Sequence, residues 1–217
     1  MRITIFDYGA GNLHSLAKAL EAPGADVRIE PDPARAAAEA DALVLPGVGA
    51  FAHAAERLAP GLEAMRSAIA ERAVPTLGIC LGMQLLFEES EEGPGRGLGV
   101  IPGVVTRLRA ERVPQIGWNQ LEDVSPDEPL FAAAPVDTAY FANSYVCRPD
   151  ASGADAVTAW ATHEGDRFAA AVRRGSAVGV QFHPEKSSRA GVAFVRAWVA
   201  GVAAAAAATT AAAGGGR

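Results

Sequence analysis

The chain has 217 residues, half of them hydrophobic and 20% charged, with a net charge of −6 and an isoelectric point near 5.3. This length favours one domain around one large core, and the negative charge argues against sequence-independent binding to nucleic acid or to an anionic membrane surface. Two cysteines are too few for a disulfide framework, and no signal peptide or long uncharged apolar span opens the chain, so we expect a cytoplasmic protein whose partners are small molecules and proteins.

The N-terminal region has the pattern of a strand, a turn and a helix. An apolar strand at residues 2–7 is followed by Tyr8-Gly9-Ala10-Gly11-Asn12 and a helix with one apolar face. Gly9 and Gly11 are compatible with a dinucleotide-binding loop, but His14 stands where that loop needs a third glycine. We therefore expect no cofactor.

The next elements continue the alternation of strands and helices. A strand at 27–29 and an alanine-rich helix at 34–40 lead to a buried strand at 42–45, which runs into Pro46-Gly47-Val48-Gly49. Two glycines beyond the carboxyl end of a strand allow backbone N–H groups to point into the crevice where open α/β sheets bind ligands, although an ordinary turn has the same composition. A helix is expected at 58–71. This order predicts a parallel sheet with helices on both faces.

The stretch from Val74 to Phe87 places Cys80 between an apolar strand and a helix-forming run. Gly78 and Gly82 give it the Gly-x-Cys-x-Gly spacing of a nucleophile elbow, whose tight turn needs small residues on either side of the nucleophile. Free N–H groups at the start of a helix favour a thiolate and can receive an oxyanion. The alternative is a buried structural cysteine.

The second half of the chain has a different pattern. An acidic, glycine-rich loop at 88–99 is followed by short predicted strands at 100–108, 115–121, 140–146, 156–162, 168–172 and 177–182. We expect this part to be largely antiparallel and appended to an open, mostly parallel sheet. A helix at 190–202 closes the domain, which spans residues 1–202, and residues 203–217 form a low-complexity Ala/Gly tail that we expect to be frayed.

His183 and Glu185 follow the last predicted strand. Residues two apart on an extended chain point the same way, and Pro184 favours an extended conformation at His183. The pair can therefore serve as a base and the acid that orients it, although a surface His and Glu would give the same pattern. The other histidines lack metal-ligand spacing, and we predict no metal site.

Two segments together resemble the class I (triad) glutamine amidotransferases, a flavodoxin-like family. They are Gly78-Ile79-Cys80-Leu81-Gly82-Met83-Gln84, which contains the elbow cysteine, and His183-Pro184-Glu185. Within that family, four further segments resemble the glutaminase subunits of imidazole glycerol phosphate synthases: residues 7–13, 46–51, 114–119 and 140–145. Many of these relatives carry a histidine where this chain has Asn143.

This resemblance implies a glutaminase that hydrolyses glutamine through a triad of Cys80, His183 and Glu185. It implies that glutamine and its oxyanion are held by Gly47, Gly49, Leu81, Gln84, Ser144 and Tyr145. It also implies a heterodimer with a cyclase subunit, which receives the ammonia and makes imidazole glycerol phosphate and aminoimidazole carboxamide ribotide in histidine biosynthesis, with Tyr140 and Lys186 facing that partner.

Two other functions remain open at this stage. One is a glutaminase of the same family that serves another synthase, against which the Tyr8-Gly9-Ala10-Gly11-Asn12 and Gly117-Trp118-Asn119 segments argue. The other is a non-enzymatic flavodoxin-like binding module in which Cys80 is structural.

Overall fold

The computed structural model describes residues 1–9 and 13–214, with side chains as far as residue 208. The Ala10, Gly11 and Asn12 part of the N-terminal motif lies outside the described residues, as does the end of the chain at 215–217. The centre of the protein is a seven-stranded sheet with the strand order β10-β11-β12-β4-β3-β1-β2. The strands are β1 (Arg2–Phe6), β2 (Asp26–Glu30), β3 (Ala42–Leu45), β4 (Thr76–Ile79), β10 (Val157–His163), β11 (Asp166–Arg174) and β12 (Ala177–Val180).

The five strands from β12 to β2 are parallel, whereas β10 and β11 are antiparallel to their neighbours. Both β3 and β4 are buried along their whole length, as strands covered on two faces must be. This arrangement confirms the predicted open, mostly parallel sheet with an antiparallel C-terminal part.

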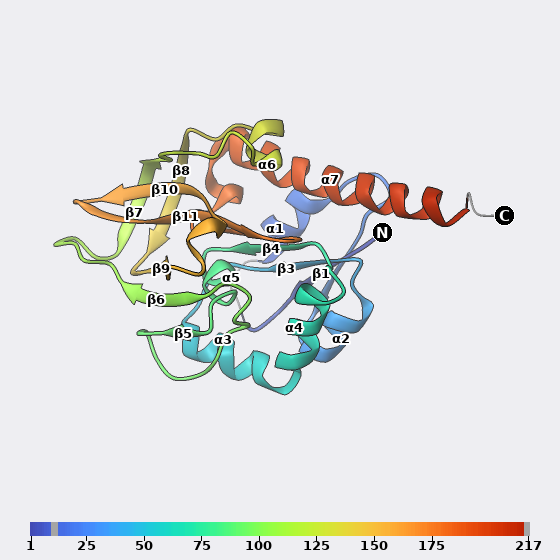
Figure 1. Ribbon diagram of the computed structural model, residues 1–217, viewed down its shortest axis with the longest axis horizontal. Coiled ribbons are helices and arrows are strands. Elements are labelled where there is room, and N and C mark those ends of the chain that lie inside the picture. The colour runs from blue at the N-terminus through green and yellow to red at the C-terminus, as the bar shows by residue number, and fades with distance from the viewer. Residues whose placement is uncertain (10–12, 215–217) are drawn as a thin grey trace.

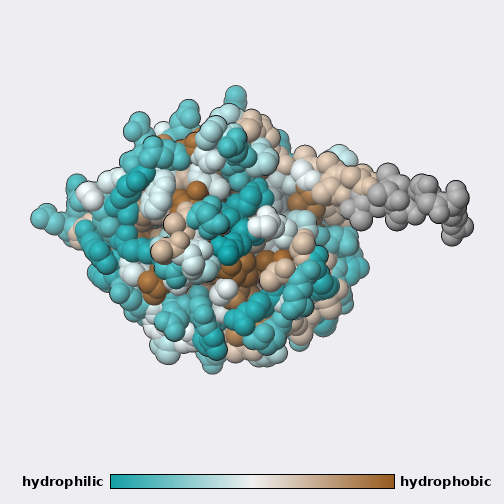
Figure 2. Space-filling model, viewed as in Figure 1, coloured by the Kyte–Doolittle hydropathy of each residue, from teal (hydrophilic) through white to brown (hydrophobic). Residues whose placement is uncertain are grey.

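Helices cover both faces of this sheet (Figure 1). One face carries α1 (Leu13–Leu20), α6 (Pro129–Ala133) and α7 (Ser188–Gly214), and the other carries α2 (Pro33–Glu39), α3 (Phe51–Leu58) and α4 (Leu62–Ala70). Two hydrophobic clusters result, one on each face, since the side chains of a strand alternate between the faces. Figure 2 shows hydrophilic residues over most of the visible face, with hydrophobic ones in small patches between them.

Two smaller sheets lie beside the carboxyl ends of the central strands. One contains β5 (Glu89–Ser90), β6 (Gly103–Arg107) and β9 (Tyr145–Pro149), and the other pairs β7 (Gln115–Gln120) with β8 (Thr138–Asn143). The prediction of one strand at 140–146 was therefore wrong, because this segment is divided between β8 and β9. The chain passes from one sheet to the other at Ser144, whose carbonyl accepts a hydrogen bond from the Leu108 N–H. The apolar sequence continues through this point, although the strand with which it pairs changes.

The prediction of one helix at 58–71 was also wrong, because two helices and a turn occupy this region. Helix α3 already begins at Phe51, and the turn η1 (Ala59–Gly61) separates it from α4. Pro60 has no N–H to donate, so a regular helix cannot continue through it. The Cβ of an alanine at Gly61 would lie 2.6 Å from the Ala34 nitrogen, so this corner packs directly against α2.

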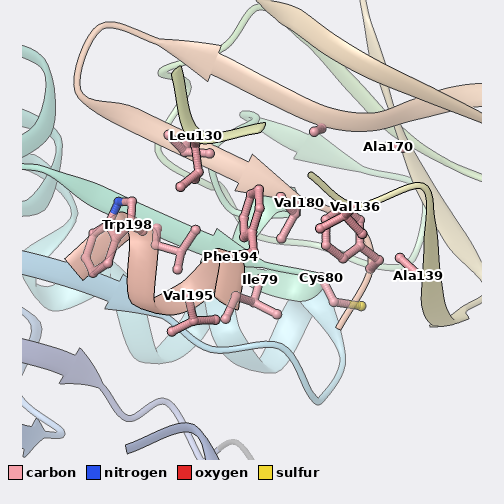
Figure 3. Packing of buried hydrophobic residues seen from close by; sticks show 14 of the residues in the cluster. Ile79, Cys80, Leu130, Val136, Ala139, Ala170, Val180, Phe194, Val195 and Trp198 are labelled. Atoms are coloured by element: carbon pink, nitrogen blue, oxygen red, sulfur yellow. The ribbon is translucent and has the colours of Figure 1, made fainter. Parts of the chain in front are cut away.

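Helix α7 continues to Gly214, so the predicted end of the last helix at residue 202 was wrong. Alanine has the highest helix propensity of all residues, so an alanine-rich extension prolongs the helix that precedes it. In Figure 1 this extension projects beyond the body of the protein. The segment Ser188–Ala208 is long and apolar enough to cross a membrane. In its first part, α7 packs Phe194, Val195 and Trp198 into the core, as Figure 3 shows, and 33% of its apolar window is buried.

Candidate active site

Cys80 lies at the joint between β4 and the single-turn helix α5 (Leu81–Gln84). Its backbone has φ 49° and ψ −103°, a conformation that residues with a side chain rarely adopt. A Cβ added to Gly78 would lie 2.6 Å from the carbonyl oxygen of Gly82. A Cβ added to Gly82 would lie 1.9 Å from the carbonyl oxygen of Leu45. Both positions therefore require glycine, as the nucleophile elbow predicts.

The helix that follows Cys80 is shorter than expected. Helix α5 ends at Gln84, although the sequence suggested a helix through Phe87. One turn carries little of the macrodipole of a long helix, so local hydrogen bonds rather than a helix dipole must stabilise a thiolate here. In Figure 3 the sulfur of Cys80 lies at the edge of the hydrophobic cluster and points away from Phe194 and Val195.

His183 and Glu185 are brought together as predicted, but by a different backbone. His183 is extended, whereas Glu185 lies in the turn η3 (Pro184–Lys186) rather than on a continued strand. His183 Nδ1 lies 2.8 Å from Glu185 Oε1, and the His183 side chain is 1% exposed. The Ser187 hydroxyl donates to the His183 carbonyl at 2.7 Å, and the His183 N–H donates to the Tyr140 carbonyl at 2.8 Å. The two backbone bonds hold the main chain at His183, and the bond to Glu185 orients the ring.

The imidazole of His183 is tuned by groups of opposite effect. Burial disfavours its charged form, but hydrogen bonds to Cys80 and Glu185 and the negative charges of both outweigh burial and raise the pKa of His183 to about 9. A protonated imidazole is thus favoured beside the sulfur at neutral pH.

A cavity of about 260 Å³ opens at these side chains. It is smaller than the ~300–1,000 Å³ of pockets for drug-sized ligands, and a single amino acid is a suitable occupant. Its lining contains Cys80, His183 and all six residues predicted to hold the substrate, namely Gly47, Gly49, Leu81, Gln84, Ser144 and Tyr145. Among residues 1–9 and 13–214 no cluster of three or more side chains is arranged to hold a metal ion.

Two residues that were not predicted from the sequence, Glu92 and Gln181, also lie at the site. Glu92 lines the cavity, and its Oε2 accepts a 2.7 Å hydrogen bond from the Phe51 N–H. Gln181 is fully buried and donates from Nε2 to Cys80 Sγ at 3.4 Å. The alternation that linked His183 to Glu185 also points back to Gln181, but Glu92 stands in an acidic loop without a periodic pattern.

The ribbon of β7 and β8 forms one rim of the cavity. Ile116 and Trp118 are 68% and 56% exposed, and Trp118 packs edge-on against Tyr140 with ring centroids 6.2 Å apart. Lys186 Nζ lies 6.0 Å from the centre of the Tyr140 ring and also lines the cavity. The predicted interface residues Tyr140 and Lys186 are thus neighbours beside the opening, together with two exposed apolar side chains.

Comparison with known proteins agrees with this geometry. The family model described as glutamine amidotransferase class-I matches residues 4–199. The imidazole glycerol phosphate synthase subunit HisH of Synechococcus sp. (strain JA-3-3Ab) is 48% identical over 210 residues, which are 94% of this chain and 95% of that protein. A HisH subunit of Thermus thermophilus is 46% identical over 200 residues, covering 90% of this chain and 95% of that protein.

Solved structures show the same fold at low sequence identity. A protein from Thermoplasma acidophilum, described as a putative GMP synthase subunit, has a TM-score of 0.73 at 19% identity, over 97% of this chain and 98% of that chain. A glutamine amidotransferase from Thermotoga maritima has a TM-score of 0.63 at 21% identity, over 93% of this chain and 84% of that chain.

Proposed function

The chain belongs to the class I glutamine amidotransferases, and from this premise we propose that it is the glutaminase subunit of an imidazole glycerol phosphate synthase, acting in histidine biosynthesis. The observation that carries this proposal is the elbow thiol of Cys80 beside the buried His183–Glu185 pair in a cavity of amino-acid size. Identity of 46–48% over nearly the whole length of HisH subunits supports the choice of synthase.

Hydrolysis begins when the Cys80 thiolate attacks the side-chain amide carbon of glutamine. The carbonyl π electrons move to the oxygen, and backbone N–H groups of Leu81 and of the Gly47–Gly49 turn stabilise the oxyanion. An imidazolium with a pKa of about 9 already carries the proton that the leaving nitrogen needs. His183 gives that proton up as the C–N bond breaks, so ammonia leaves and a thioester remains on Cys80.

The thioester is then hydrolysed by water. Neutral His183 removes a proton from the water as its oxygen bonds to the thioester carbon, and the C–S bond breaks to release glutamate and the thiolate. Glu185 accepts from Nδ1, so the other ring nitrogen faces the reacting atoms in both half-reactions.

The free ends of glutamine are matched by charge at the cavity wall. The Glu92 carboxylate is held by the Phe51 N–H and offers its second oxygen to the α-ammonium of the substrate. Backbone groups near Gly49, Ser144 and Tyr145 are available to the substrate, and Gln84 lies beside them. A glutamine side chain directed from this anchor toward Cys80 presents its amide to the sulfur.

The partner in this proposal is a cyclase subunit that receives the ammonia before it is protonated in water. The exposed pair Ile116 and Trp118, with Tyr140 and Lys186, supports docking at this rim, because aromatic side chains are enriched in the centres of interfaces. A partner seated there covers the opening of the glutamine cavity, so ammonia passes directly between the two subunits.

The test is glutamate release from glutamine by the purified chain, alone and with a cyclase subunit and its nucleotide ligand. We expect release that the loaded partner stimulates, and a loss of at least about 10³-fold in Cys80→Ala. The control is Cys147→Ala, since Cys147 is a buried cysteine outside the cavity lining, and this variant keeps the activity. Equal release by Cys80→Ala and wild type contradicts the triad, and no stimulation by the partner contradicts the choice of synthase.

A further inference from the structure

Gln181 is a fully buried polar side chain in contact with the sulfur of Cys80. It follows β12, whose Val180 pairs with Ile79 of β4, and the Cys80 N–H donates to the Val180 carbonyl at 2.7 Å. The parallel pairing therefore places Gln181 next to Cys80. His183 lies two residues further along an extended segment, so both side chains reach the cysteine from the same strand end.

The direction of the Gln181 amide is determined by its neighbours. Gln84 Nε2 lies 3.1 Å from the Tyr145 carbonyl oxygen and 3.3 Å from Gln181 Oε1. A backbone carbonyl can only accept, so the Gln84 nitrogen must face it and also donate to the Gln181 oxygen. The Gln181 nitrogen then necessarily faces Cys80 Sγ, at 3.4 Å.

We propose that Gln181 is a catalytic residue of this site, which holds Cys80 as a thiolate through an N–H···S hydrogen bond whose direction is fixed by Gln84 and the Tyr145 carbonyl. A donor locked toward sulfur stabilises the anion and offers no acceptor to an S–H group. The chain of bonds also joins the substrate wall, at Gln84, to the nucleophile. The same Tyr145 carbonyl accepts a second hydrogen bond, from Asn143 Nδ2 at 3.2 Å, through its other lone pair.

Substitution of Gln181 removes none of the other ionisable groups near the sulfur. His183, Glu92 and Lys186 line the cavity. Tyr8 and Cys147 are buried, and burial together with the charge of Cys80 raises the pKa of each well above its usual value. A change in the titration of Cys80 in a Gln181 variant therefore reports the lost hydrogen bond.

The experiment measures the rate of Cys80 alkylation by iodoacetamide from pH 5 to pH 10, with the modified residue assigned by peptide mass spectrometry. Gln181→Met keeps the length of the side chain and removes the donor. Because a hydrogen bond to a charged group contributes about 1.5–3 kcal/mol, the midpoint of the alkylation curve should rise by about one to two pH units. Gln115→Met is the matched control, since Gln115 is also buried but does not line the cavity, and its curve should coincide with wild type.

Gln181→Glu is the second variant and tests the sign of the effect. Its carboxylate can still accept from Gln84 but faces the sulfur with a negative charge, so the midpoint should rise further than in Gln181→Met. Unchanged midpoints in folded Gln181→Met and Gln181→Glu overturn the proposal. The inference rests on the proposed function only in taking Cys80 as the nucleophile. Shifted curves without any glutamate release would contradict the proposed function and leave only the stabilisation of the Cys80 thiolate by Gln181 standing.

Discussion

Cys80 has a strained backbone that only its surroundings can hold. Conformations of this kind cost about 1–3 kcal/mol each, and they are found where a side chain must be presented at a sharp turn. The turn is possible because Gly78 and Gly82 let β3, β4 and α5 approach at backbone contact. At the scale of single residues, the absence of two Cβ atoms thus determines where the thiol stands.

Gly82→Ala tests this close approach. The new Cβ would lie 1.9 Å from the Leu45 carbonyl oxygen, and backbone on both sides cannot move away cheaply. We expect a loss of at least about 3 kcal/mol in the free energy of unfolding, measured by urea denaturation. Gly201→Ala in α7 is the control, because nothing lies within 4 Å of its Cβ and alanine should stabilise the helix by about 0.5–1 kcal/mol. Similar effects of the two substitutions would contradict this view of the elbow.

The titration of His183 gives a second prediction at this scale. Burial alone lowers its pKa, so the value of about 9 depends on Cys80 and Glu185. Below pH 9 the ring is the acid that leaving ammonia needs, and above pH 9 it loses that proton, so glutamate release should fall as the pH rises through about 9.

The same titration can be followed directly by NMR on the ring protons of His183. Cys80→Ala removes a hydrogen bond and a negative charge that favour the imidazolium. Glu185→Gln removes a negative charge, although its amide oxygen can still accept from Nδ1, so each variant should move the midpoint to lower pH. His163→Gln is a control, because that histidine is bonded to the Arg112 carbonyl, away from the cavity. A His183 midpoint that stays near 9 in both triad variants would contradict the pairing described here.

At the scale of elements, apolar runs and turn residues predicted the central sheet and the place of the elbow. The strands β3 and β4 are short, continuous apolar runs that end in glycine-containing turns, and such runs have few alternatives in an α/β chain. The break at Ser144 could not be predicted in this way, because both strands beside it are apolar and the sheet to which each belongs is decided by distant partners. The alternation that links His183 to Glu185 places Gln181 on the same side, but its side-chain partners Gln84 and Cys80 come from other elements, so its role could not be predicted from its own segment.

One ion pair joins the antiparallel part of the sheet to α6. Arg173 on β11 donates to both carboxylate oxygens of Glu128, at 2.6 and 2.5 Å, and the Glu128 side chain is 2% exposed. The same carboxylate accepts from the Leu130 N–H at the start of α6. Because this carboxylate is out of contact with water, its charge depends on the guanidinium for compensation.

Arg173→Met should therefore destabilise the fold by about 3 kcal/mol in urea denaturation, since it leaves a buried carboxylate without its partner. Adding Glu128→Gln should recover much of this loss, because the amide is neutral and its oxygen can still accept from Leu130. The neighbouring Arg174→Met is the control: Arg174 pairs at 3.4 Å with Asp155, which is 82% exposed, and such pairs contribute under about 1 kcal/mol. Equal losses for the two arginines would show that burial of Glu128 is unimportant.

At the scale of the whole molecule, the rim of the cavity is connected to the triad by backbone. The Tyr140 carbonyl accepts from the His183 N–H, and the Tyr140 N–H donates to the hydroxyl of Ser187, which in turn donates to the His183 carbonyl. The strand β8 that carries Tyr140 pairs with β7, where Ile116 and Trp118 are exposed. A partner that presses on this ribbon therefore acts on the segment that positions His183.

Trp118→Ala tests whether this rim is the docking surface. Large aromatic residues dominate interface energies, so we expect the affinity for the cyclase subunit, measured by isothermal titration calorimetry, to fall by about 30-fold or more, which is about 2 kcal/mol. Trp118 does not line the glutamine cavity, so the partner-independent glutaminase rate of the free chain should stay near that of wild type. Ile29→Ala is the control, because Ile29 is 49% exposed on the edge strand β2, outside this rim. If Ile29→Ala weakened the complex and Trp118→Ala did not, the partner would have to dock at the opposite edge of the sheet, and direct passage of ammonia from this cavity would be impossible.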